Sequence, residues 1–309
     1  MPGHWKNGRS FIILGGMQNR ASRTAEQVAL FRALETARHH DRVFTDPFAA
    51  RFLHGTYRLL ARAAAIPAVN RRLEHYIDAR YPAGPRGSAI ARTRLIDDLT
   101  LEALADGARQ VVLLGAGYDS RAYRLPAMAR ATVFEVDHPA TQQAKQRLLR
   151  GAVHPQRRAH VRLVPADLTV DDLAASLRAA GFETLERTVV VWEGVTNYLT
   201  APAVDATIRA LAAITGSDSR LIFTYVDRRA LDGTGDFPGF DEWHASVRAV
   251  GEPWTFGFVP SELPAYLAER DLTLFLDLSA REAADRYLLP LGRHDAAAPF
   301  YRIAAAEIR

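Results

Sequence analysis

A run of residues from Val111 to Leu125, VVLLGAGYDSRAYRL, contains residue types that could bind a charged small molecule. The run predicts a buried strand, a tight turn with Gly115 and Gly117, and the start of a helix. In the dinucleotide fingerprint G-x-G-x-x-G a third glycine would stand at position 120, where this chain has Ser120. Asp119 beside it would repel a pyrophosphate but could hold an ammonium group. We therefore expect a nucleoside ligand that carries an amino acid rather than a dinucleotide.

Acidic residues also follow the second and third expected strands. Glu135 and Asp137 lie about 20 residues after the glycine turn, where a carboxylate can accept hydrogen bonds from both ribose hydroxyls. The alternative is that they cap the helix expected from Pro139. Asp167 and Leu168 follow the third strand and could read an adenine edge or cap the next helix. Because the carboxyl ends of parallel strands share one crevice, we expect these residues beside the glycine turn.

The segment after the fourth expected strand, WEGVTNYL from Trp192 to Leu199, combines a glutamate with further polar groups. A glutamate directly after a buried strand is costly unless it has a partner. Asn197 and Tyr198 add hydrogen-bonding groups in the same place. We interpret Glu193 as a ligand-facing carboxylate, and the alternative is a loop residue that faces water.

Two arginines, Arg92 and Arg94, lie on the helix expected before the first strand. A guanidinium group can bind a carboxylate through two parallel hydrogen bonds, so either side chain could clamp an acidic group of the ligand. The alternative is simple solvation, which is the usual state of an arginine on a helix.

Several common catalytic arrangements are absent from the sequence. There is no cysteine, which excludes a disulfide scaffold, a thiolate nucleophile and zinc–cysteine sites. The ten histidines show no spacing typical of metal ligands, so we expect no metal. Neither G-x-S-x-G nor a phosphate-binding G-K-[ST] motif occurs, which argues against an α/β-hydrolase and an NTPase.

The first part of the chain is expected to be helical. Apolar residues recur at helical spacing from about Ser22 to Ala37, and Asp46-Pro47 opens a further helical stretch. Helices are also expected over 71–79 and 88–105, separated by a loop rich in proline and glycine over 81–87.

From Gln110 strands and helices alternate, which predicts an α/β fold whose mostly parallel sheet has helices on both faces. The expected strands are 111–114, 132–136, 161–164, 189–192, 221–226, 273–278 and 301–308. The expected helices between them are 139–150, 171–180, 202–214 and 260–270. A stretch rich in glycine, aspartate, proline and aromatic residues follows the fifth strand and predicts a lid over about residues 228–259.

The length of 309 residues suits one enlarged α/β domain. We expect residues 1–20 to form an extended N-terminus, with Met17 as an alternative start, and residues 21–309 to form a single domain. Within it, residues 21–108 would be a helical cap packed against the sheet and residues 109–309 the α/β core with its lid.

The bulk composition is that of an ordinary globular protein, with 48% hydrophobic and 24% charged residues and a net charge of +4. The basic residues are scattered rather than gathered in a stripe with aromatic residues, so we expect no nucleic-acid partner. No apolar run approaches the roughly 20 residues that span a bilayer, and the apolar patch 11–14 is too short for a signal peptide. We expect no membrane partner and a cytoplasmic location; the composition does not indicate an oligomeric state.

These segments together resemble the leucine carboxyl methyltransferase family, and within it the bacterial S-adenosylmethionine-dependent methyltransferases. The matching stretches are TAEQVALFRALE, TDPFAARFL, ARTRLIDD, VVLLGAGYDSRAYRL, VFEVDHPATQQAK, ADL, WEGVTNYL and GEPWTFGF. They span nearly the whole chain from about Arg23 onward. The resemblance implies a class I methyltransferase fold, with a Rossmann-like sheet of seven strands, the last one antiparallel, and an N-terminal helical cap.

The resemblance also implies roles toward the cofactor S-adenosylmethionine. Arg92 would bind the methionyl carboxylate with help from Arg32, and Glu193 would lie beneath the methionyl end near its ammonium group. WEGVTNYL departs from the family's usual pattern at Thr196 and Asn197. This departure concerns the part of the site that would bind the methyl acceptor rather than the cofactor. The remaining positions would bind the nucleoside, with Gly115 and Gly117 lining it, Asp137 and Glu135 holding the ribose, and Asp167 and Leu168 contacting adenine.

Methyl transfer from a sulfonium requires mainly that the nucleophile is aligned and water excluded. A carboxylate acceptor is ionised at neutral pH and needs no base, whereas a phenol or alcohol does. The candidates for that base are Tyr198, His138 and His244. Six aromatic residues of the lid are suited to an apolar acceptor or, alternatively, to packing within the lid: Phe237, Phe240, Trp243, Trp254, Phe256 and Phe258.

The leading hypothesis is an O-methyltransferase that acts on the carboxyl or hydroxyl group of a small molecule, as in secondary metabolism. One alternative is methylation of a protein C-terminal carboxylate, which predicts an open, groove-like acceptor mouth. The other is a nucleoside-binding module that has the fold but no turnover.

Overall fold

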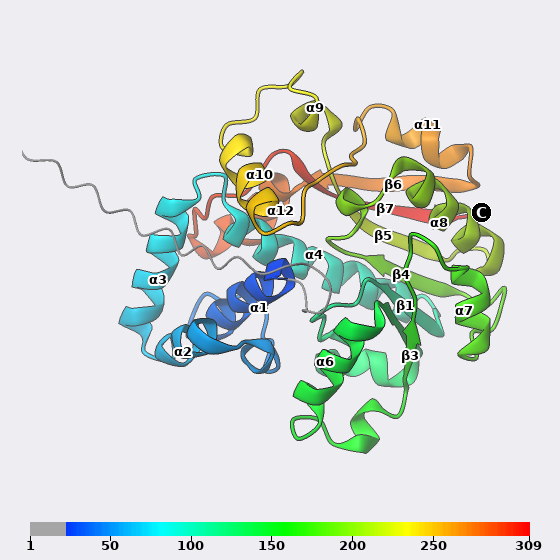
Figure 1. The fold of residues 1–309 in the computed structure, drawn as a ribbon, viewed down its shortest axis with the longest axis horizontal. Helices are drawn as coiled ribbons and strands as arrows, with labels where there is room; N and C mark the ends of the chain where they lie inside the picture. Colours follow the sequence, from blue (N-terminus) through cyan, green and yellow to red (C-terminus); the bar gives the residue numbers. More distant parts are fainter. Residues whose placement is uncertain (1–22) are drawn as a thin grey trace, which may run out of the picture.

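The computed structural model describes residues 23–309, whose fold is shown in Figure 1. The expected extended N-terminus over residues 1–20 and the alternative start at Met17 lie outside the described residues. Within 23–309 no helix is both long and apolar enough to cross a membrane.

A seven-stranded sheet lies at the centre of the molecule, with the strand order β3-β2-β1-β4-β5-β7-β6. The strands are β1 (Gln110–Leu114), β2 (Thr132–Asp137), β3 (Val161–Pro165), β4 (Thr188–Trp192), β5 (Arg220–Val226), β6 (Leu272–Ser279) and β7 (Tyr301–Ile308). Strands β1 to β5 pair in parallel, whereas β7 is antiparallel to both of its neighbours. The expected sheet is confirmed, and each strand end lies within one residue of its predicted position.

Among the described residues, four helices precede the sheet, and Figure 1 shows the first three gathered to one side of it. They are α1 (Arg23–Thr36), α2 (Gly55–Ala63), α3 (Pro67–Arg80) and α4 (Pro85–Ala105). The expected loop over 81–87 is too long, because α4 begins with Pro85 at its first turn, a position that proline favours. Asp46 does not open an α-helix; it accepts hydrogen bonds from two backbone N–H groups ahead of a short 3₁₀ turn, Ala49–Phe52.

The later helices alternate with the strands or belong to the segment after β5. They are α5 (Arg121–Arg124), α6 (Pro139–Leu149), α7 (Leu173–Ala179), α8 (Ala201–Ile214), α9 (Arg228–Leu231), α10 (Phe240–Ala249), α11 (Leu263–Ala268) and α12 (Ala280–Tyr287). The predicted lid segment contains α9 and α10. Helix α12 was not predicted, although Ser279 and Glu282 form the capping box that marks its start.

The two faces of the sheet carry separate apolar cores. Alternate residues of a strand point to opposite faces, so Val111 and Leu113 of β1 join the core beneath α1, α4 and α12. Val112 and Leu114 join the second core, which includes residues of α7, α8 and α11. Helices therefore cover both faces, as the alternation of strands and helices predicts.

Buried ion pairs attach α1 to the C-terminal part of the chain. Arg293, which follows α12, pairs with Glu35 of α1 at 2.8 Å, and both side chains are buried. The same guanidinium pairs with Asp295, which also pairs with Arg86 of α4. Removal of one partner of a buried pair leaves an uncompensated charge, so the attachment of α1 depends on these charges being matched.

We expect Arg293→Met to lower the free energy of unfolding by about 3–5 kcal/mol, because Glu35 would remain buried without its counter-charge. Chemical denaturation followed by tryptophan fluorescence measures this change. The double variant Arg293→Met/Glu35→Met should recover part of the loss. A single variant as stable as the parent chain would contradict the importance of this pair.

Candidate functional site

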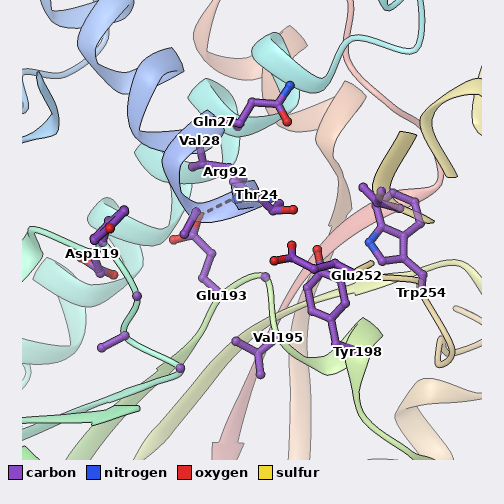
Figure 2. Close-up of a pocket in the computed structure, with 18 of the residues that line it drawn as sticks. Thr24, Gln27, Val28, Arg92, Asp119, Glu193, Val195, Tyr198, Glu252 and Trp254 are labelled. Atoms are coloured by element: carbon purple, nitrogen blue, oxygen red, sulfur yellow. Dashed lines mark hydrogen bonds and ion pairs between the residues drawn. The ribbon is translucent and has the colours of Figure 1, made fainter. Parts of the chain in front are cut away.

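A cavity of about 580 Å³ opens at the carboxyl ends of β1 and β4. The strand order reverses between these two strands, and ligands of open α/β sheets bind at such a point. Residues of α1, α4 and α10 line the other sides of the cavity. Figure 2 shows these side chains converging on one space.

The glycine turn after β1 forms one wall of the cavity. Gly115 has a positive φ of 62°, and a Cβ added there would lie 2.4 Å from Cγ2 of Val195, so only glycine fits. The backbone N–H of Gly117 donates to Asp137, which brings that carboxylate to the cavity wall. Ser120, at the place of the third fingerprint glycine, donates to Asp46 at 2.6 Å and so joins the turn to the segment after α1.

A buried arginine neutralises two of the acidic residues at the cavity. Arg121 is 1% exposed, and its Nη1 donates to Oδ2 of Asp119 at 2.6 Å and to Oε2 of Glu193 at 2.7 Å. Its Nε donates to Asp97 of α4 at 2.7 Å. Although burial opposes ionisation, the charge of Arg121 lowers the pKa of Asp119. Asp119 and Glu193 both line the cavity as predicted, and a carboxylate oxygen with one such bond keeps a lone pair for a ligand.

Arg92 of α4 reaches the same cavity. Its Nε donates to Oε1 of Glu193 at 2.7 Å, as drawn in Figure 2, and its guanidinium lies 5.1 Å from the ring centroid of Tyr301. Burial opposes ionisation of Glu193, but the charges of Arg121 and Arg92 hold its pKa well below the ordinary value. Within residues 23–309 Arg92 donates hydrogen bonds only through Nε, so its terminal nitrogens face no protein acceptor.

The two other arginines considered from the sequence have different surroundings. Arg32 lines the cavity but is already engaged, because it pairs with Asp46 at 3.0 Å and donates to the Tyr118 carbonyl at 2.6 Å. It therefore holds the glycine turn against α1. Arg94 pairs with Asp98 on the same helix and does not line the cavity. Its position therefore agrees with the alternative interpretation, a helix arginine that faces solvent.

Glu135 does not share the cavity with Asp137. It lies two residues earlier on β2, about 7 Å from the strand end, and is covered by α6. Its carboxylate pairs with Lys145 of that helix at 2.9 Å and lines a separate, smaller cavity of about 70 Å³. The expected ribose role of Glu135 is therefore not supported by its position, whereas that of Asp137 is.

Asp167 and Leu168 also lie outside the cavity. Asp167 accepts hydrogen bonds from the backbone N–H of Thr169 at 2.9 Å and from its hydroxyl at 2.6 Å, which forms a turn after β3. Leu168 packs against the second core. The alternative that Asp167 caps the next helix is wrong, because Asp172 caps α7, whereas the adenine contact stays a prediction.

Of the three candidate bases, only Tyr198 lines the cavity. Burial raises its pKa to about 12, against a smaller opposing effect of the Trp254 and Thr24 side chains, so the side chain is a neutral phenol at pH 7. His138 is exposed and caps α6, where its Nδ1 accepts from the N–H of Ala140. His244 packs between Phe240 and Trp254 rather than on the cavity wall.

The cavity has a second, aromatic half. Trp243 and Trp254 lie with ring centroids 5.4 Å apart, and Trp243 stacks on Tyr301 at 6.0 Å. The other four aromatic residues of the predicted lid do not line the cavity; Phe237 and Phe240 pack on Phe300, and Phe256 and Phe258 join the second core. Packing within the fold thus accounts for four of the six aromatic residues, and contact with an apolar acceptor stays a prediction for Trp243 and Trp254.

Sequence reasoning missed two residues of the aromatic half. Tyr301 is the first residue of β7, which was predicted as a strand but not as part of the site. Glu252 lies in the stretch GEPWTFGF, which follows α10. The signal for Glu252 was its place beside Trp254 in a stretch that the family resemblance had already singled out. Residues 23–309 contain no cluster of histidine, aspartate and glutamate suited to a metal ion.

The strand order, the glycine turn and the cavity at the reversal point define the class I methyltransferase architecture. A crystal structure from Thermobifida fusca, described as an inferred methyltransferase, superposes with a TM-score of 0.56 and 17% identity, covering 89% of this chain and 97% of that one. A DUF574 family protein from Streptomyces avermitilis superposes with a TM-score of 0.54 and 16% identity, covering 94% and 98%. The expected fold is confirmed.

The chain belongs to the leucine carboxyl methyltransferase family, whose profile matches residues 25–212. A relative from Mycolicibacterium smegmatis is 38% identical over 228 residues, 72% of this chain and 73% of the relative. One from Frankia alni is 36% identical over 216 residues, 68% of this chain and 70% of the relative. Both are named for an inferred S-adenosyl-L-methionine-dependent methyltransferase activity. The prediction of a methyltransferase that uses this cofactor is confirmed.

The lowered pKa of Glu193 predicts an acid-dependent loss of stability. A carboxylate whose pKa is depressed in the folded state stabilises that state at pH values above its ordinary pKa of 4.5. This contribution is lost as the pH falls below 4.5. We expect Glu193→Gln to show a shallower decrease in unfolding free energy between pH 5 and about 3 than the parent chain. The matched control Glu242→Gln, on the exposed side of α10, should keep the parent slope. Equal slopes for all three proteins would contradict the assignment.

Proposed function

We propose that this enzyme transfers a methyl group from S-adenosylmethionine to an oxygen atom, of a carboxyl or hydroxyl group, on a small apolar molecule. The observation that carries the proposal is the division of one cavity into a charged half and an aromatic half. The charged half suits a zwitterionic nucleoside donor, and the aromatic half suits an apolar acceptor.

The residues of the charged half fit the donor. The terminal nitrogens of Arg92 can bind the methionyl carboxylate, and the second lone pairs of Glu193 and Asp119 can accept from its ammonium group. Asp137, fixed by the N–H groups of Gly117 and His138, can accept from the ribose hydroxyls. When bound, S-adenosylmethionine supplies an electrophilic methyl group.

The aromatic half supports a small acceptor over a protein chain end. Trp243 and Trp254 from the segment after β5 and Val28 from α1 line the same cavity, so an acceptor there would lie between two parts of the chain. Such a position can align the nucleophile and exclude water, which are the main requirements of methyl transfer. A protein C-terminus would need an open groove at this place.

We expect Arg92→Leu to weaken binding of S-adenosylhomocysteine about 10- to 100-fold, because a charge-assisted hydrogen bond to the ligand carboxylate contributes about 1.5–3 kcal/mol. Titration calorimetry measures this affinity. The matched control Arg94→Leu, on the outer side of the same helix, should bind like the parent chain.

Transfer of a labelled methyl group to a panel of small phenols and aromatic acids tests the acceptor side. Methylation of at least one small molecule is the expected result. A parent chain that does not bind S-adenosylhomocysteine would contradict the whole proposal, whereas transfer only to protein C-termini would contradict the acceptor class.

A further inference from the structure

Glu252 is a carboxylate of the aromatic half that lacks a counter-charge. Its Oε2 is fully buried and, among residues 23–309, has neither a hydrogen-bond donor nor an ion-pair partner. Figure 2 shows this carboxylate directed into the cavity beside Tyr198. Buried polar atoms nearly always have a partner, so an orphaned atom in a cavity indicates a group supplied by a ligand.

The other carboxylates of the cavity differ from Glu252 in this respect. Asp119 and Glu193 are neutralised by Arg121, and Glu193 also by Arg92. Asp137 accepts from two backbone N–H groups. Of the cavity carboxylates described, Glu252 is therefore the one that no cationic side chain neutralises and whose Oε2 accepts no hydrogen bond.

A hydrogen-bond donor lies beside it. The indole Nε1 of Trp254 is buried and has no acceptor at good hydrogen-bonding geometry within the described part of the chain, although it lies close enough to the Tyr198 hydroxyl to lower the pKa of that group. In Figure 2 this nitrogen faces the same space as Glu252 and Tyr198. An indole N–H only donates and an ionised carboxylate only accepts, so the two groups present complementary halves of one recognition site.

A hydroxyl group matches both of these requirements. It can donate to Glu252 and accept from Trp254, whereas a carboxylate acceptor can only accept and would be repelled by the charge of Glu252. An ammonium group could donate to Glu252 but would leave the indole N–H without an acceptor. The three candidate bases from the sequence do not replace Glu252 as the proton acceptor, because Tyr198 is a neutral phenol and His138 and His244 do not line the cavity.

We infer that the acceptor is a neutral phenol or alcohol whose hydroxyl binds between Glu252 and Trp254, with Glu252 as the group that takes its proton. The inference rests on the proposed function and narrows its acceptor class from carboxyl or hydroxyl to hydroxyl. As the new bond from the acceptor oxygen to the methyl carbon forms, the carbon–sulfur bond of the donor breaks and its electron pair stays on sulfur. The hydroxyl proton passes to the carboxylate of Glu252, which balances the charge.

A matched pair of probes tests this inference by binding alone. The full chain, saturated with S-adenosylhomocysteine, is titrated by calorimetry with 2-naphthol and with 2-naphthoate, which share their rings and differ in the polar group. We expect the parent chain to bind 2-naphthol at least about tenfold more tightly than 2-naphthoate, because Glu252 repels the carboxylate. Glu252→Gln should remove most of this preference while its binding of S-adenosylhomocysteine stays unchanged.

Two further variants separate the roles of the groups. Trp254→Phe should weaken 2-naphthol about tenfold through loss of the indole donor, and Glu242→Gln, an exposed change on α10, should behave like the parent chain. The inference is overturned by a parent chain that prefers 2-naphthoate, by an unchanged preference in Glu252→Gln, or by failure of 2-naphthol to bind while S-adenosylhomocysteine still binds. Failure of S-adenosylhomocysteine to bind would instead overturn the proposed function on which the inference rests.

Discussion

The site depends on one buried guanidinium, that of Arg121, which is bound to three carboxylates from three parts of the chain. Asp97 belongs to α4, Asp119 to the glycine turn, and Glu193 to the segment after β4. Acidic groups stay ionised when buried only beside a matching charge, which Arg121 supplies together with Arg124 at Asp97 and with Arg92 at Glu193; the arginine in turn could not stay buried without them. Matching their charges fixes the relative positions of the helix, the turn and the strand end that form the charged half of the cavity.

The two halves of the cavity differ in how far their polar groups are paired within the protein. In the charged half nearly every ionised group is paired within the protein, so the site is held in place before a ligand arrives. In the aromatic half, among residues 23–309, Oε2 of Glu252 accepts no hydrogen bond and the indole N–H of Trp254 has no acceptor at good geometry. Such pre-organisation reduces the ordering cost of binding a donor, while unpaired groups discriminate among acceptors by the hydrogen bonds that they require.

The sequence predicted the sheet well because runs such as VVLL and TVVVW are apolar and β-branched, and turn residues bound them. It also predicted that Glu193 needs a partner, but the identity of that partner could not be read from spacing, since Arg92 and Arg121 lie 101 and 72 residues away. Glu135 and Asp137 are both acidic and lie on the same face of β2, so their depth along the strand decides which of them reaches the cavity. Glu252 was missed because lack of a partner is a property of packing, which a sequence does not display.

The pair between Glu35 and Arg293 has a consequence for how the protein is made. The two residues are 258 positions apart, so helix α1 is synthesised long before its counter-charge exists. The sheet also depends on a late part of the chain, because β6 pairs with the other strands only through β7, which follows it in sequence. Contacts between residues so far apart in the sequence form slowly, because the chain loses conformational entropy in closing the loop before the contact stabilises it. The pair between Glu35 and Arg293 and the complete sheet can therefore form only after Arg293 and β7, respectively, have left the ribosome.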